Sequence, residues 1–162
     1  MTGRKSAVAL ANILSWLWGN IGNNQLTNSE INENLDACMA LIPLEDEGPW
    51  VSEQAAAEDA GAAVAYALRC LRSGESQAAA WAARCLYESL DHYVINRENI
   101  DVNRAGAEAR VIEHPLVQAE LARQCRDLEE LLGINDEDVW NVVARFRERA
   151  KAEGAMFFGA TS

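Results

Sequence analysis

The chain has 162 residues, of which 49% are hydrophobic and 24% are charged, values that fit a globular protein of one domain. Its formal net charge of -11 disfavours binding to nucleic acid or to anionic membrane surfaces, because both are negatively charged. Frequent alanine, with only 10 glycines and 3 prolines, favours helices. No run of about 18 apolar residues is present, so we expect no transmembrane helix.

The first predicted helix covers residues 6–18 and has an apolar face at helical spacing. The positions on this face are Leu10, Ile13, Leu14 and Leu17. Polar residues interrupt the apolar run, so it predicts an amphipathic helix rather than a secretory signal. The Gly- and Asn-rich stretch 19–24 ends the helix, because both residue types tolerate the left-handed backbone of a helix exit.

The second helix is predicted over residues 29–42. Thr27 and Glu30 have the spacing of a capping box at its start, and Pro43 ends it. Its apolar seam is narrow, as in a coiled coil, and consists of Ile31, Leu35, Cys38 and Ile42. A loop over residues 44–51 follows.

The third helix is predicted over residues 53–72, and its apolar stripe is rich in small residues. Small residues let helix axes approach closely, so we place this helix at the centre of the fold. The stripe consists of Ala57, Ala60 or Gly61, Val64, Ala67 or Leu68, and Leu71. A turn over residues 73–75 leads to a fourth helix over 76–97. The stripe of this fourth helix consists of Trp81, Cys85, Leu86, Leu90 and Tyr93.

Residues 98–113 have weak periodicity and predict a mostly irregular or partly helical connection. Pro115 suits the first turn of a fifth helix over residues 115–132, since its missing N–H is not needed there. The stripe of this helix consists of Val117, Leu121, Gln124 or Cys125, Leu128 and Leu132.

The sixth helix is predicted over residues 136–153, with Asn135 or Asp136 as its cap. Its stripe consists of Val139, Val143, Phe146 and Ala150. No segment shows the sustained alternation of a strand. The expected fold is therefore all-α, a single-domain bundle of about six helices over residues 1–162.

The four cysteines and two of the five tryptophans are expected to be buried on or beside these stripes. Cys38, Cys70, Cys85 and Cys125 form no C-x-x-C pair, which favours buried reduced thiols and a cytoplasmic setting. Trp81 and Trp140 fall near apolar stripes and are expected in the core. Three others, which either anchor a protein contact or cap the bundle ends, are Trp16, Trp18 and Trp50.

Glu88, Asp91 and His92 are the best candidates for chemistry, because residues three and four apart share one face of a helix. Helical bundles hold metals with such groups, but here a matching second helix is missing. A solvated or capping role is the preferred interpretation, and His114, before a proline, is expected at a helix start. The sequence predicts no catalytic residue and no cofactor.

The last predicted helix carries a basic cluster in which arginines and a lysine alternate with acids. This pattern predicts a solvated face with local ion pairs. The cluster consists of Arg145, Arg147, Arg149 and Lys151.

Four stretches resemble the YjaG-like family of uncharacterised bacterial proteins. They are NENLDACMALIP (32–43), AAAEDAGAAVAYALRCLRSGE (55–75), EHPLVQAEL (113–121) and the basic segment 142–154. The resemblance implies an all-helical fold and a bacterial cytoplasmic setting, and it implies no reaction, cofactor or catalytic residue.

The chain departs from that family in two places. Residues 155–159 differ from the family's usual segment, and an additional N-terminal helical segment of the family is not found. Loss of a packed helix exposes an apolar face, which predicts an interaction site on the first helix, most simply in a two-fold homodimer. The predicted contact residues are Leu10, Ile13, Leu14, Trp16, Leu17, Trp18 and Trp50.

We therefore expect a non-enzymatic helical domain that binds itself or another protein. The acidic charge suits a basic protein partner, through electrostatic steering. The alternative is a metal-binding helical bundle with hydrolase-type or ligand-binding activity around Glu88, Asp91 and His92.

Overall fold

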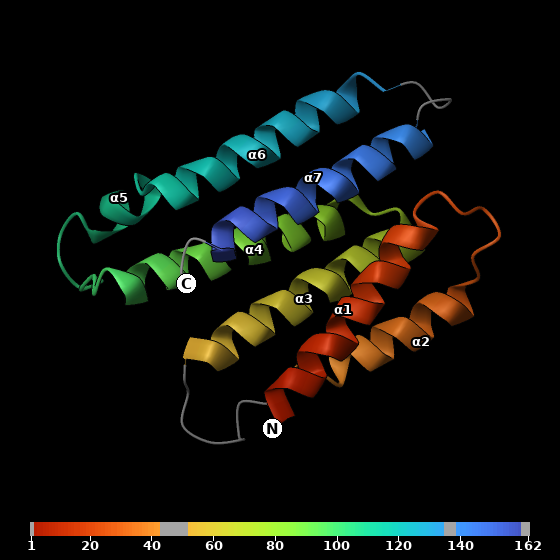
Figure 1. Cartoon of the computed structure of the whole chain (residues 1–162), viewed down its shortest axis with the longest axis horizontal. Coiled ribbons are helices and arrows are strands. Elements are labelled where there is room, and N and C mark those ends of the chain that lie inside the picture. The colour runs from red at the N-terminus through yellow and green to blue at the C-terminus, as the bar shows by residue number, and fades with distance from the viewer. Residues whose placement is uncertain (1, 43–51, 135–138, 160–162) are drawn as a thin grey trace.

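The chain is all-α in the computed structural model, which describes residues 2–42, 52–134 and 139–159. Seven helices and no strands occur in these residues (Figure 1). They are α1 (Thr2–Asn20), α2 (Asn28–Met39), α3 (Ser52–Ser73), α4 (Ser76–Arg97), α5 (Ala107–Ile112), α6 (Pro115–Leu132) and α7 (Val139–Gly159). None of the described helices is long and apolar enough to cross a membrane.

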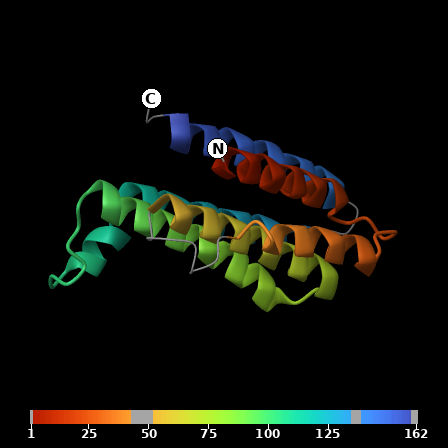
Figure 2. The same cartoon turned by 90° about the horizontal axis from the view of Figure 1, so that it is seen from below.

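The helices form two layers (Figure 2). One layer contains α2, α3, α4 and α6, with the short α5 at one end, and α1 and α7 lie together on one face of it. Helix α3 contacts α1, α2 and α4, which confirms its predicted central place.

A capping box at the start of α2 matches the sequence prediction. The Thr27 Oγ1 accepts a hydrogen bond from the Glu30 N–H at 3.3 Å, and the Glu30 Oε2 accepts one from the Thr27 N–H at 2.9 Å. This exchange satisfies two backbone donors that have no partner inside the helix. The helix ends at Met39, three residues before the predicted end at 42.

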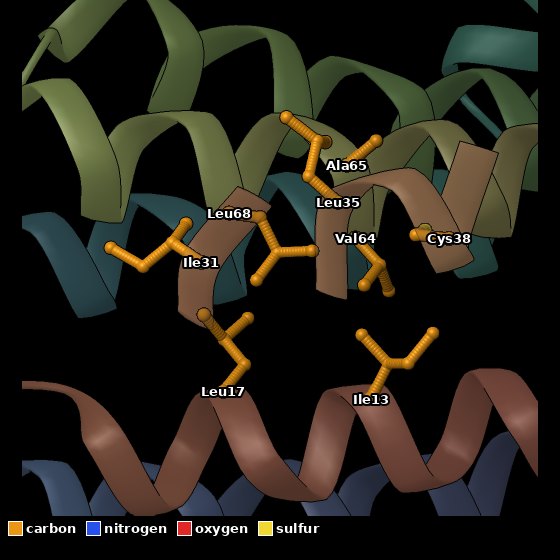
Figure 3. Close-up of a cluster of buried hydrophobic side chains, with 8 residues drawn as sticks. All are labelled: Ile13, Leu17, Ile31, Leu35, Cys38, Val64, Ala65 and Leu68. Atoms are coloured by element: carbon orange, nitrogen blue, oxygen red, sulfur yellow. The ribbon is translucent and has the colours of Figure 1, made fainter. Parts of the chain in front are cut away.

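The first core cluster joins α1, α2 and α3 (Figure 3). Its members are Ile13, Leu17, Ile31, Leu35, Cys38, Val64, Ala65 and Leu68. Gly61 brings α3 close to the end of α2, because a Cβ at this position would lie only 2.7 Å from the Ile42 Cγ1. The predicted α2 seam and the small-residue stripe of α3 therefore meet.

A second core cluster lies at the α5 end of the molecule. Its members are Val94, Ile100, Ala107, Val111 and Val117. Helix α5 occupies part of the segment expected to be irregular or partly helical, and it contributes two of these side chains. Gly106 allows the chain to enter α5, since its φ of 84° is unfavourable for residues with a Cβ.

Several residues predicted to be buried are exposed instead. Trp81 and Trp140 are 39% and 56% exposed, and Leu128 and Leu132 are 61% and 88% exposed. Cys125 is exposed as well, although three of the four free cysteines are buried or half-buried. Periodicity shows which side of a helix is apolar, but it does not show whether a neighbour covers that side along its full length.

We expect Leu68→Ala to lower the free energy of unfolding by about 2–5 kcal/mol, because this fully buried side chain would leave a cavity at the meeting of three helices. Leu14→Ala is the matched control, since Leu14 is 40% exposed, and its effect should stay below about 1 kcal/mol. Urea denaturation followed by circular dichroism measures both, and equal losses would contradict the burial assigned to Leu68.

Candidate functional site

The three predicted metal-binding residues of α4 do not converge. The Glu88 Oε1 accepts a hydrogen bond from the Arg84 Nε at 2.7 Å, so this carboxylate is already paired. The His92 Nδ1 lies 3.5 Å from the Asp59 Oδ2 on α3. Nowhere in the described residues do three His, Cys, Asp or Glu side chains group as metal ligands. The geometry therefore gives the metal-binding interpretation no support.

Asp59 is a half-buried acid inside an alanine-rich helix, and no sequence pattern had marked it as a candidate. Its Oδ2 is buried and has no hydrogen-bond partner among the described residues, and the basic group that faces it is His92. Burial raises the pKa of the Asp59 carboxyl above the ordinary value of 3.8, the charge of His92 opposes this rise, and the charge of Glu88 adds to it. Burial likewise raises the pKa of Asp91. The α3–α4 contact therefore contains one carboxyl, that of Asp59, which is costly to ionise, and Asp91 on α4 is a second such carboxyl.

His114 caps α6, as its position before a proline predicted. Its Nδ1 accepts a hydrogen bond from the Leu116 N–H at 3.2 Å, which satisfies one free donor of the first turn. The imidazole therefore has a structural role at this helix start.

Two of the three arginines of α7 bind acids on α6, and this corrects the prediction of local ion pairs on a solvated face. Arg149 donates to the Glu130 Oε2 at 2.9 Å and to the Asp127 Oδ1 at 2.7 Å, and Arg145 also donates to Glu130. These bonds lower the pKa of Glu130, with the contribution of Arg149 the largest. Of this cluster, only Lys151 makes the expected local pair, with Glu148.

The remaining contacts of α7 with the body are also largely polar. Arg126 on α6 lies 3.0 Å from Glu153, and the Arg147 Nη2 lies 3.1 Å from the Ser15 Oγ on α1. Among the described side chains of α7, Val142 is the only buried hydrophobic one. Helix α7 therefore contacts the bundle mainly through ion pairs and hydrogen bonds of charged side chains.

Glu120 is a buried carboxylate on α6 beside a small cavity. It is 2% exposed, and it accepts hydrogen bonds from the Arg123 Nε at 2.7 Å and from the Gln124 Nε2 at 2.7 Å. The cavity has a volume of about 170 Å³ and is lined by Leu86, Leu90, Glu120, Arg123, Ala150, Glu153 and Gly154. Because Arg123 and Gln124 already donate to Glu120, the hydrogen bonds of this buried carboxylate are satisfied within α6.

The face of α1 that was predicted to contact a partner is partly used inside the chain. Ile13 and Leu17 are buried in the first core cluster, and Leu10 and Trp16 pack against it. Leu14, at the edge of the same face, is exposed. Trp18 is half-buried, and Trp50 lies outside the described residues. A partner contact at α1 stays a prediction.

The C-terminal half of α6 has a bare apolar face. The α6 stripe begins with Val117, which is fully buried, and continues through the half-buried Leu121. Further along, Leu128, Leu131 and Leu132 are 61%, 50% and 88% exposed. Their spacing of three and four residues puts them on one side of the helix. We call these three leucines the bare α6 face.

Comparison with protein-family models, with curated proteins and with solved structures gives no match for this chain. The resemblance to the YjaG-like family therefore stays a prediction, and function has to be inferred from the geometry of the side chains.

We expect Asp59→Asn to stabilise the protein by on the order of 1 kcal/mol at neutral and mildly alkaline pH. A carboxyl whose pKa is raised by folding costs stability once the pH rises through that pKa, and the amide does not ionise. The gain should shrink as the pH falls toward 3.8. Denaturant unfolding across this pH range measures it, with the exposed Asp36→Asn as the control. A gain that does not change with pH would contradict ionisation of Asp59 as the cause.

We expect Arg149→Gln to loosen α7, since Arg149 bridges Asp127 and Glu130. Amide hydrogen exchange over residues 139–154 should become several-fold faster, while exchange in α3 should stay unchanged. Lys151→Gln is the control, because its ion pair stays within α7. If both variants give the same exchange profile, charge pairing to α6 does not hold this helix.

Proposed function

We propose that the chain is a non-enzymatic interaction domain that pairs with a second copy of itself through the bare α6 face. The observation that supports this most directly is the half-covered stripe on α6, where a single apolar surface is buried at Val117 and exposed at Leu132. Exposed apolar clusters of this kind mark protein contacts, because burying them releases ordered water at little polar cost.

The charge around the bare α6 face also suits self-association. Two chains with a net charge of -11 repel each other wherever acids are in excess. On α6 and the described part of α7 beside it, five carboxylates form ion pairs with four guanidiniums and one ammonium group, and only Glu129 and Arg147 make no ion pair within the described residues. The paired groups are Glu120, Asp127, Glu130, Glu148, Glu153, Arg123, Arg126, Arg145, Arg149 and Lys151. This neighbourhood therefore has little net charge to oppose contact between copies.

A two-fold axis through the bare α6 face would bring the same three leucines of each copy together. Such a contact needs only one self-complementary patch, which is why two-fold dimers are the commonest oligomers. An antiparallel pair of α6 helices would shield Leu132, the most exposed of the large hydrophobic side chains in the described residues.

A basic protein is the second candidate partner, and it would use a different surface. Several exposed acids make no ion pair within the described residues, among them Asp36 on α2 and Glu113 before α6. These groups are the source of the net charge that would steer a cationic protein toward the domain. A cytoplasmic setting belongs to the same proposal, supported by four cysteines without a disulfide bond, and a bacterial origin rests on the family resemblance alone.

Self-association should appear in sedimentation experiments as a weight-average mass that rises above 17.8 kDa toward twice that value with concentration. The double variant Leu128→Gln/Leu132→Gln should remain a monomer over the same range, because it removes most of the bare α6 face without adding charge. Circular dichroism should show an unchanged helix content, since both side chains are exposed.

Val102→Gln is the matched control, because Val102 is 59% exposed but lies in the connection before α5. It should associate like the wild type. A wild-type chain that stays monomeric at micromolar and higher concentrations would refute the dimer. If the double variant associates as the wild type does, the contact between copies lies on another surface. The exposed part of α1 would then be tested next.

A further inference from the structure

A polar hollow of about 640 Å³ opens beside the turn between α3 and α4. It lies on a different part of the fold from the bare α6 face. Its lining comes from the end of α3, the start of α4 and one residue of α2, and consists of Leu35, Tyr66, Arg69, Arg72, Ser73, Glu75, Gln77, Ala78 and Trp81. A volume of this size is enough for a small organic molecule.

Two aromatic rings form one wall of the hollow. The ring centroids of Tyr66 and Trp81 are 6.2 Å apart with an interplanar angle of 26°, so the rings are stacked. The Arg69 guanidinium lies 5.6 Å from the Tyr66 centroid. Each ring has an arginine three residues further along its own helix, and the Arg84 guanidinium lies 5.1 Å from the Trp81 centroid. Trp81 is nevertheless 39% exposed, which leaves aromatic surface open to a ligand.

The arginines of the hollow have no acidic partner within the described residues, which is unusual in a chain with 25 acids and 14 bases. In that part of the chain, Arg69 contacts only the Tyr66 ring, and Arg72 donates only to the Asn32 Oδ1 at 3.0 Å. Most other arginines of the described chain pair with a carboxylate, as Arg84 does with Glu88. The hollow therefore contains two guanidinium charges that no carboxylate in the described residues neutralises through an ion pair.

Gln77 and Glu75, which also line the hollow, affect which kind of ligand could bind there. The Gln77 side-chain amide makes no hydrogen bond within the described residues, so both its donor and its acceptor are available to a planar heterocycle. Glu75 is the only acid among the described residues of the lining, and its charge would weaken the binding of any anion.

We propose that this hollow binds a nucleoside monophosphate, with the phosphate on Arg69 and Arg72 and the base against Trp81 and Gln77. Guanidinium groups bind phosphate through charge-assisted hydrogen bonds, and aromatic side chains bind bases of any type by stacking. Neither feature alone selects a nucleotide, but the two together favour a ligand that carries a flat ring and an anionic group. This proposal is independent of the dimer, because it involves no residue of α6.

Isothermal titration calorimetry with AMP, CMP, adenosine and inorganic phosphate tests the proposal. The nucleotides should bind at least about tenfold more tightly than adenosine or phosphate, because only they engage both halves of the hollow. Arg69→Gln should weaken AMP binding about tenfold, which is the typical effect of losing a charged hydrogen bond. Glu75→Gln should tighten it several-fold, a gain that a merely structural role of Glu75 would not produce.

Arg97→Gln is the matched control, because the Arg97 guanidinium lies 5.9 Å from the Tyr93 centroid, outside the hollow. It removes the same charge and should leave AMP binding within about twofold of the wild type, since the two sites share no contact. Circular dichroism should show that all three variants fold. Nucleotides that bind no better than phosphate, or equal weakening by Arg69→Gln and Arg97→Gln, would overturn the proposal.

Discussion

The close contact between Gly61 on α3 and Ile42, just after α2, sets how closely these two helices approach. A side chain at this position would collide with Ile42, so only a glycine lets the two helices approach as they do. Cys38 then donates to the Gly61 carbonyl at 3.3 Å, and Leu35, Val64 and Leu68 come together beside it. Helix α1 closes this cluster with Ile13 and Leu17 (Figure 3). The packing of α1, α2 and α3 in this cluster thus depends on a glycine at position 61.

The two helices of the outer layer are attached by different forces. Helix α1 contributes two buried side chains to the first core cluster, whereas α7 relies mainly on arginines that reach Asp127 and Glu130. Hydrophobic burial changes little with ionic strength, but half-exposed ion pairs weaken as salt screens them. The same layer therefore has one salt-insensitive helix and one salt-sensitive helix, and the sensitive one covers the cavity beside Glu120.

Local signals in the sequence predicted much of the fold. The Thr27–Glu30 capping box, the proline at the start of α6 and the α2 seam all depend on residues a few positions apart, and all are present. The exposure of Trp140 and Leu132 was missed, because burial depends on helices distant in sequence.

The functional candidates show the same limit. Glu88 and His92 share a helix face, but their partners, Arg84 and Asp59, could not be inferred from spacing on one helix. The hollow was also missed, although Tyr66 and Arg69 on α3 and Trp81 and Arg84 on α4 show matching spacings. The aromatic and basic side chains of the hollow come together only because the α3–α4 turn places the two helices side by side.

The two-residue turn between α3 and α4 has a consequence for how the chain folds. These helices are neighbours in sequence and run along each other for most of their length, so forming their interface closes only a short loop. Folding dominated by such local contacts is fast. We therefore expect the α3–α4 hairpin to form first, with α2 and α1 adding to one of its sides and α6 to the other. Helix α7 has to wait for α6 to present Asp127 and Glu130, and its docking would be the final step.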